Sequence, residues 1–209
     1  MEFDFETLAP DDRYKILTST IVPRPIAWIT TVSKSGVRNA APFSFFNAMS
    51  KTPPILAVGI QANSDGSMKD SARNILDTGE FVVNLVTRSV ASAMNLTSVE
   101  APSDVDEIAL ADLDTLPSLK VLPPRLTASP VAFECKLHTP IEVAKSQLIV
   151  LGEIVQAHVA DAFVLDANKH YIDTPALSLV GRLHGRGWYV GTKDSFQMER
   201  PAPFSTGKR

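Results

Sequence analysis

The sequence predicts a mainly β protein, a closed barrel with a few peripheral helices. Apolar runs rich in β-branched residues recur along the chain between turn residues. Most of these runs alternate only weakly, which is typical of strands that are covered on both faces. Helical segments are few and clustered, which argues against regularly alternating strand–helix units.

Six runs are the expected strands. The longest has Gly152 in its middle, and a glycine at that place is typical of a bulge or a bend at a barrel corner. Cys135 lies in an alternating run, so we expect it to be a small buried thiol rather than a nucleophile. The expected strands are Ile26–Val32, Ile55–Ile60, Glu80–Leu85, Val131–Leu137, Leu148–His158 and Leu177–Val180.

Three segments are expected to contain helix. Met68–Asp77 has apolar residues at helical spacing and is followed by Gly79, a typical C-terminal cap. Thr87–Thr97 predicts a second short helix, and Leu8–Leu17 is long enough for a helical turn near the start. We find no repeat and no low-complexity linker, so we expect one domain, 1–209, with N- and C-terminal extensions.

Composition excludes several classes of protein. The net charge is −3 and there is no basic run, which argues against nucleic-acid binding. No run approaches the roughly 18 apolar residues of a membrane span, and the acidic N-terminus lacks a signal core. A single cysteine excludes an intramolecular disulfide and suits a reducing compartment. We therefore expect a cytoplasmic protein that does not bind a membrane.

The chain lacks the usual signatures of hydrolases and metalloenzymes. There is no P-loop, GxGxxG, GxSxG or HExxH pattern, and the four histidines lie far apart. The segment Glu100–Leu116 carries six acidic residues, but their spacing matches no calcium loop. We expect this segment to be a solvated loop or a lid.

The segment Asn39–Ser50 (NAAPFSFFNAMS) is dense in small and hydroxylated residues. Pro42 would stiffen it, and its alanines would let a ligand approach the backbone closely. One interpretation is a surface that holds a heteroaromatic ring with a polar edge. The other is a loop whose Ser and Asn side chains cap its own turns. The residues alone do not favour either interpretation.

Four blocks together resemble the flavin reductase-like, FMN-binding split-barrel family, in particular its longer members, the group that includes flavoredoxin. They occur in the expected order over nearly the whole chain. The first is PRPIAWITT (23–31) with NAAPFSFFN (39–47) and Pro53-Pro54, and the second is KDSARNI (69–75) with TGEFVVNL (78–85). The third is Pro123-Pro124-Arg125 with SPVAFECKL (129–137), and the fourth is LGEIV (151–155) with His158, 179–189 and Arg200-Pro201.

The resemblance implies a split β-barrel that forms a homodimer, with FMN near the subunit interface. By resemblance, the isoalloxazine ring would contact Ser44, Phe45, Asn47 and Ala48, and the ribityl chain or phosphate would contact Thr31 and Ser50. Lys69 and Ser71 would hold the phosphate at a helix start. The family commonly has threonine where this chain has Ser71, so the hydroxyl is kept. Arg24 is either a second cation for FMN or a surface guanidinium packed on Trp28.

The implied reaction is hydride transfer from NADH or NADPH to FMN, without a catalytic acid–base side chain. His184 faces the flavin or nicotinamide pocket in one interpretation and is a surface turn histidine in the other, since the family often has a small residue there. Reduced FMN would pass to a partner monooxygenase or another electron acceptor. The alternatives are a non-catalytic FMN-binding electron carrier and an enzyme like pyridoxamine-phosphate oxidase, which the blocks fit less well.

Overall fold

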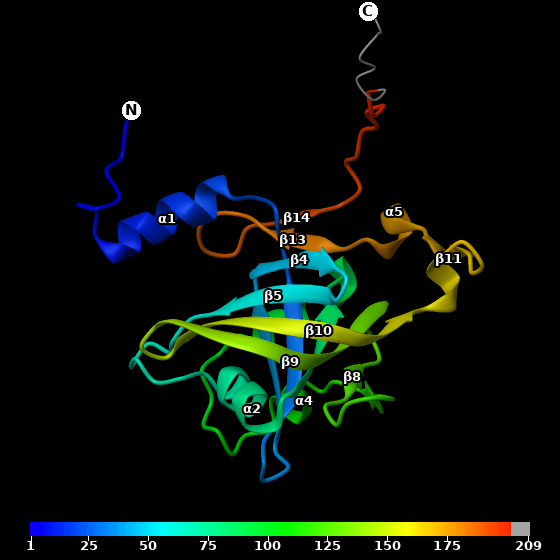
Figure 1. Cartoon of the computed structure of the whole chain (residues 1–209), viewed down its shortest axis with the longest axis horizontal. Coiled ribbons are helices and arrows are strands. Elements are labelled where there is room, and N and C mark those ends of the chain that lie inside the picture. The colour runs from blue at the N-terminus through cyan, green and yellow to red at the C-terminus, as the bar shows by residue number, and fades with distance from the viewer. Residues whose placement is uncertain (202–209) are drawn as a thin grey trace, which may run out of the picture.

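The computed structural model describes residues 1–201; the end of the expected C-terminal extension, 202–209, lies outside the described residues. Its main sheet has seven antiparallel strands in the order β3-β2-β6-β9-β10-β5-β4 (Figure 1). Along the chain these strands are β2 Ala27–Val32, β3 Arg38–Phe43, β4 Phe45–Lys51, β5 Pro54–Ile60, β6 Glu80–Leu85, β9 Val131–Ala144 and β10 Gln147–Val159.

The two edges of this sheet meet at one residue. β3 is one edge strand and β4 is the other, yet only Ser44 separates them in the chain. The sheet must therefore curl round until its edges come together, which confirms the expected barrel. The interpretation of Asn39–Ser50 as a loop is wrong. Its polar residues are tolerated in strands because both strands lie at an edge, and β4 is largely exposed.

Both faces of the barrel wall are covered. Ile29 of β2 packs inside the barrel with Phe81 and Ile75, whereas Trp28 of the same strand packs outside it with Met94 and Ile108. All six residues of β2 are buried, which explains the weak alternation in the sequence.

Gly152 lies where β10 bends. The pairing of β9 and β10 shifts register between Leu151 and Gly152, which confirms the expected bulge. A Cβ at Gly152 would overlap the ring of Phe81 on β6, so the close approach of β10 to this ring requires glycine. Cys135 is fully buried beside this contact, and burial raises the pKa of its thiol, as expected for a structural cysteine.

The helices lie around the barrel (Figure 1). α2 packs Ala72 and Ile75 into the barrel core and ends at Gly79, whose φ of 74° is the left-handed cap that the sequence predicts. The helical elements are α1 Pro10–Thr20, α2 Asp70–Thr78, η1 Arg88–Val90, α3 Ala91–Leu96, α4 Glu107–Leu110, η2 Asp161–Phe163 and α5 Thr174–Leu177. No helix within residues 1–201 is long and apolar enough to cross a membrane.

Three small sheets complete the described chain. The predicted strand Leu177–Val180 is wrong, because Asp173 caps a helical turn, α5, that ends at Leu177. β13 then begins only at Val180. The strands of these sheets are β1 Arg24–Pro25, β13 Val180–Arg182 and β14 Tyr189–Gly191 in one sheet, β7 Thr115–Leu116 with β8 Arg125–Leu126, and β11 Val164–Asp166 with β12 Tyr171–Ile172.

Candidate functional site

Three adjoining hollows follow the chain from β3 into β4, and we call them together the groove. The first hollow, about 90 Å³, lies at the start of α2; the second, about 210 Å³, lies beside Ser44; the third, about 440 Å³, lies under the end of α1. Phe43 and Lys69 line both the first and the second hollow, and Ser44 and Phe45 line both the second and the third. The groove therefore suits one elongated ligand.

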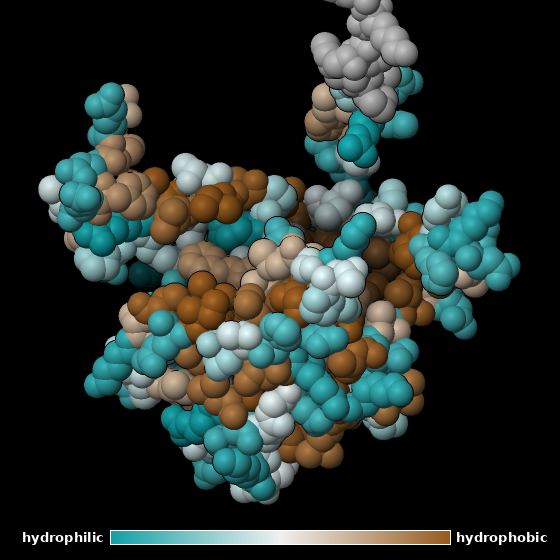
Figure 2. Space-filling model, viewed as in Figure 1, coloured by the Kyte–Doolittle hydropathy of each residue, from teal (hydrophilic) through white to brown (hydrophobic). Residues whose placement is uncertain are grey.

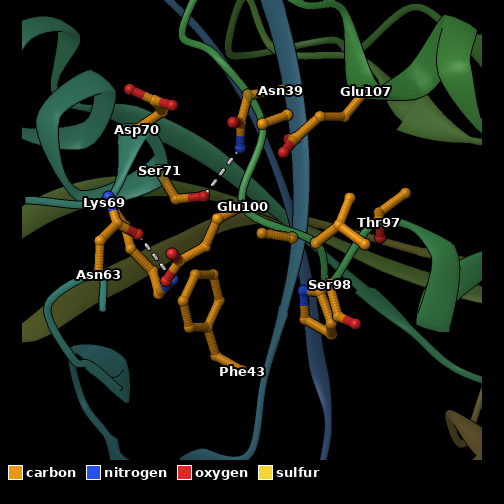
Figure 3. Close-up of a pocket in the computed structure, with 14 residues that line it drawn as sticks. Asn39, Phe43, Asn63, Lys69, Asp70, Ser71, Thr97, Ser98, Glu100 and Glu107 are labelled. Atoms are coloured by element: carbon orange, nitrogen blue, oxygen red, sulfur yellow. Dashed lines mark hydrogen bonds and ion pairs between the residues drawn. The ribbon is translucent and has the colours of Figure 1, made fainter. Parts of the chain in front are cut away.

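Lys69 and Ser71 both line the first hollow (Figure 3). Lys69 is the residue before α2, and its extended backbone turns the chain into the helix. Its Nζ donates to Asn63 Oδ1 at 2.8 Å and lies 3.5 Å from Glu100 Oε1, with 28% of the side chain still exposed. The lysine is thus aimed by two neighbours while it remains accessible from the hollow.

A buried carboxyl group, Glu107, closes the far side of the first hollow. Its Oε2 accepts a hydrogen bond from Ala40 N at 2.9 Å, and the Asn39 amide lies between this carboxyl and Ser71. Burial raises the pKa of Glu107 to about 7, and the nearby Asp70 adds to the rise. The first hollow therefore contains a group that titrates near neutral pH.

Arg24 lies at the third hollow and is buried, so its interpretation as a surface residue is wrong. Its guanidinium donates to Thr18 O at 2.7 Å, Ile21 O at 3.0 Å and Leu183 O at 2.9 Å. These carbonyls tie the end of α1 to the turn after β13. They carry no net charge, and within residues 1–201 Arg24 forms no ion pair. The third hollow thus has a buried positive charge on its wall.

The wall of the groove between these ends is mostly apolar. Phe45 packs near Tyr14 of α1, with ring centroids 6.2 Å apart. Asn47 lines the third hollow, and its Oδ1 accepts from Ala48 N at 2.8 Å. Asn47 also lines a separate apolar hollow of about 600 Å³ on the side of β13 and β14, and Ala48 lines that hollow alone. Of the four expected ring contacts, Ser44, Phe45 and Asn47 therefore lie together at the third hollow, at the junction of β3 and β4 and along β4.

Four predicted site residues lie away from the groove lining, Ala48 on the side of the separate hollow and three others elsewhere. Thr31 is fully buried on β2, and its hydroxyl accepts from Asn74 Nδ2 of α2 at 3.0 Å. Ser50 is exposed on β4 beyond the hollows, where it accepts from Thr52 N at 3.3 Å. His184 lies in the exposed turn between β13 and β14 and stacks on Trp188, with ring centroids 5.9 Å apart.

The sequence interpretation missed Asn63, Tyr14 and Glu107 as lining residues. Glu107 was expected in a solvated acidic segment, but it begins α4 and is buried together with Ile108. The signal was the Asp-Glu-Ile pattern at 106–108, in which Asp106 caps the helix by accepting from Ala109 N at 3.0 Å. Within the described residues no group of acidic, histidine and cysteine side chains has the arrangement of a metal site.

Comparisons with known proteins agree with this geometry. Residues 19–175 match the family model described as a flavin reductase like domain. An uncharacterized protein of Deinococcus radiodurans is 41% identical over 95% of this chain and 88% of that protein.

Two solved structures share the fold over nearly their whole length. One is nitrilotriacetate monooxygenase component B from Bacillus cereus, with a TM-score of 0.88 and 32% identity over 95% of this chain and 98% of that one. The other is a 2-nitrobenzoate 2-nitroreductase from Pseudomonas fluorescens, with a TM-score of 0.88 and 29% identity over the whole of both chains.

Proposed function

The chain belongs to the flavin reductase-like domain family, and from this premise we propose that it binds FMN and is an NAD(P)H-dependent flavin reductase. The observation that carries the proposal is the groove along β3 and β4. It has a lysine and a helix start at one end and an apolar wall with a buried cation at the other. FMN has the matching parts in the same order, a phosphate and a flat ring joined by a ribityl chain.

The phosphate end of FMN would lie in the first hollow. The first N–H groups of α2 have no partner within the helix, and a helix start favours an anion. Lys69 adds a positive charge, and Ser71 adds a hydroxyl that faces Asn39. These groups hold the ligand by charge and hydrogen bonds rather than by shape.

The ring would lie along Phe45 and Asn47, where the wall of the third hollow is mostly apolar. When bound, FMN supplies the redox chemistry of the reaction. Arg24 and the backbone N–H groups of β4 orient the ring, and the buried guanidinium favours a ligand that gains negative charge on reduction. The desolvation of Arg24 lowers the pKa of its guanidinium, which is the cost of keeping this charge at the hollow.

The proposed reaction also needs an electron donor and an electron acceptor. We infer that NADH or NADPH supplies electrons and that they pass to a partner monooxygenase or another acceptor. The likeness to a monooxygenase component supports the first acceptor, and the likeness to a nitroreductase supports a small molecule. A non-catalytic electron carrier is the second candidate function, because hydride transfer to a bound flavin needs no acid–base side chain and both functions would use the same groove.

We also propose that the chain forms a homodimer. β6 pairs with β9 only as far as Lys136, so the rest of β9 has β10 on one side and no strand within residues 1–201 on the other. Ile141 and Val143 are exposed on this free edge. Apolar surface also gathers on the barrel face below α1 (Figure 2). An exposed strand edge with apolar side chains offers unpaired backbone groups and apolar surface to another chain.

The visible spectrum of the purified protein tests the function. We expect flavin bands to persist through gel filtration, or to appear when FMN is added, and to bleach on anaerobic addition of NADH or NADPH. Bleaching by a protein partner alone would favour the electron carrier. No flavin binding at micromolar FMN would contradict the proposal, and riboflavin serves as the control ligand that lacks the phosphate.

A further inference from the structure

The first hollow holds more negative than positive charge. Among the described residues its lining has one lysine, Lys69, and three carboxyl groups, Asp70, Glu100 and Glu107. Glu100 is already engaged, because it accepts from Ser64 N at 2.9 Å and from Ser64 Oγ at 2.6 Å. A phosphate dianion would add two negative charges to this hollow, so protonation of one of the carboxyl groups would favour its binding.

The Asn39 amide lies between Glu107 and Ser71, and either its oxygen or its nitrogen can face Glu107. One end of the amide lies 2.8 Å from Glu107 Oε2, and the other lies 2.8 Å from Ser71 Oγ. If Glu107 is ionised, the amide nitrogen donates to Glu107 and the amide oxygen accepts the Ser71 hydroxyl proton. If Glu107 is protonated, the amide turns over, accepts the carboxyl proton and donates to Ser71 Oγ.

These two states leave Ser71 with different hydrogen-bonding capacity. In the ionised state its hydroxyl proton is used by Asn39. In the protonated state Ser71 accepts from Asn39 Nδ2, so its own O–H is free to donate into the hollow, toward a phosphate oxygen (Figure 3). Ser71 is 1% exposed and Glu107 6% exposed, so solvent does not replace these partners.

We propose that Glu107, Asn39 and Ser71 form a proton relay at the phosphate end of the groove, in which Glu107 takes up one proton from solvent when a phosphate dianion binds. The inference rests on the proposed function, because it places the phosphate of FMN in the first hollow. Ser71 then touches the ligand, whereas Glu107 acts through Asn39 as a positioning residue.

The charged groups around Glu107 agree with a proton that is shared near neutral pH. Asp106, the residue before α4, is paired with Arg38 of β3 at 2.7 Å. Lys69 and Asp70 face Glu107 from the start of α2, and Glu100 faces the same hollow from the segment before α4. The Asp70 carboxylate favours protonation of Glu107 and Lys69 opposes it, so a bound dianion shifts the balance toward the protonated form.

Isothermal titration with FMN at pH 7.5, in buffers of different ionisation enthalpy, counts the protons taken up. At this pH the phosphate is almost fully dianionic, since its second pKa is about 6. If the phosphate raises the pKa of Glu107 by about one unit, we expect about half a proton per FMN. On the same basis the Kd of the wild type rises about sixfold between pH 6.5 and 8.5.

Glu107→Gln is the variant that separates the relay from other pH effects. The glutamine amide oxygen can accept from both Ala40 N and the Asn39 amide, as the carboxylate does, but the glutamine side chain cannot take up a proton. We expect this variant to bind FMN with no net proton uptake and without the sixfold rise in Kd between pH 6.5 and 8.5. The control is Asp104→Asn, at an exposed acidic residue of the same segment, which should behave as the wild type.

The outcomes distinguish the two proposals. Binding of FMN by the wild type without proton uptake would overturn the relay and leave the proposed function standing, even if Glu107→Gln failed to fold. Equal proton uptake by the wild type and Glu107→Gln would also overturn the relay. Absence of FMN binding by the wild type would overturn both.

Discussion

Single charged residues give the groove its two different ends. Lys69 is a partly exposed cation at the start of α2, whereas Arg24 is a buried cation held by three carbonyl groups. The exposed lysine suits a phosphate that arrives with its charge already present. The buried arginine suits a ring whose negative charge develops only on reduction, because a buried cation interacts strongly with nearby charge.

Replacing Lys69 with alanine should weaken FMN binding. A charge-assisted hydrogen bond contributes about 1.5–3 kcal/mol, so we expect the Kd to rise about 10- to 100-fold in a fluorescence titration. Lys34→Ala is the matched control, since Lys34 forms only an exposed pair with Asp77, 3.0 Å away. An unchanged Kd for Lys69→Ala would remove this residue from the phosphate site.

Glu107 should make the ligand-free protein less stable as the pH rises. Its pKa is about 7 in the folded chain and near 4.5 when unfolded, so the folded state binds the extra proton. The stabilisation is complete below pH 4.5 and is lost as the pH rises through 7, by about 3 kcal/mol at most.

Urea unfolding at pH 5 and pH 8 measures this loss. The free energy of unfolding of the wild type, taken relative to that of Glu107→Gln, should decrease from pH 5 to pH 8. A constant difference between the two proteins would contradict the burial argument. Comparison with the variant cancels other titrating groups, among them the Glu134–His158 pair, whose atoms are 2.6 Å apart.

Pairs of strands, rather than single residues, shape the barrel wall. The bend of β10 at Gly152 brings this strand against Phe81 of β6 and curves the sheet. On β9, the next strand, the fully buried Glu134 accepts from Leu119 N at 2.8 Å and Lys120 N at 2.6 Å, which fixes the loop before β8. Although burial opposes it, these bonds and His158 hold the pKa of Glu134 below its usual range.

Gly152→Ala should destabilise the barrel. The new methyl group would displace the Phe81 ring in a fully packed core, and overpacking of this kind costs about 1–3 kcal/mol. Chemical denaturation measures the effect. Gly191→Ala, at a strand glycine with open space around it, is the control and should change the stability little. Equal effects of the two substitutions would show that the contact with Phe81 is not the cause.

At the scale of the whole molecule, the free edge of β9 predicts the oligomeric state. Light scattering after gel filtration should give the mass of a dimer, twice 22.7 kDa. Placing aspartates at both Ile141 and Val143 should shift the protein toward monomer, because two charges would be buried at the interface.

Leu165→Asp is the control for this prediction, since Leu165 is 67% exposed on β11, outside the main sheet. It should leave the mass unchanged. A wild-type monomer at micromolar concentration would contradict the proposed dimer. A double variant that remains dimeric would place the interface elsewhere.

The sequence by itself determined five strands of the main sheet, the helix α2 and the family, because these rest on local patterns and on motif order, whereas β3 and β4 were not among the expected strands. Glu80–Leu85 forms β6 with the predicted bounds, and Gly79 ends α2 as its position after the apolar face indicates. The sequence also places Lys69 and Ser71 at the start of this helix, since a helix start can be located from its own residues.

Only the tertiary structure decided which side chains meet. Ser44 joins two strands that are neighbours in the chain but opposite edges of the sheet, and this closure creates the groove. Thr31 points to α2, and Glu107 is buried against β3, because partners distant in sequence pack there. Burial depends on those partners, so residues of one chemical type, such as the six acids of Glu100–Leu116, become solvated, paired or protonated according to the fold.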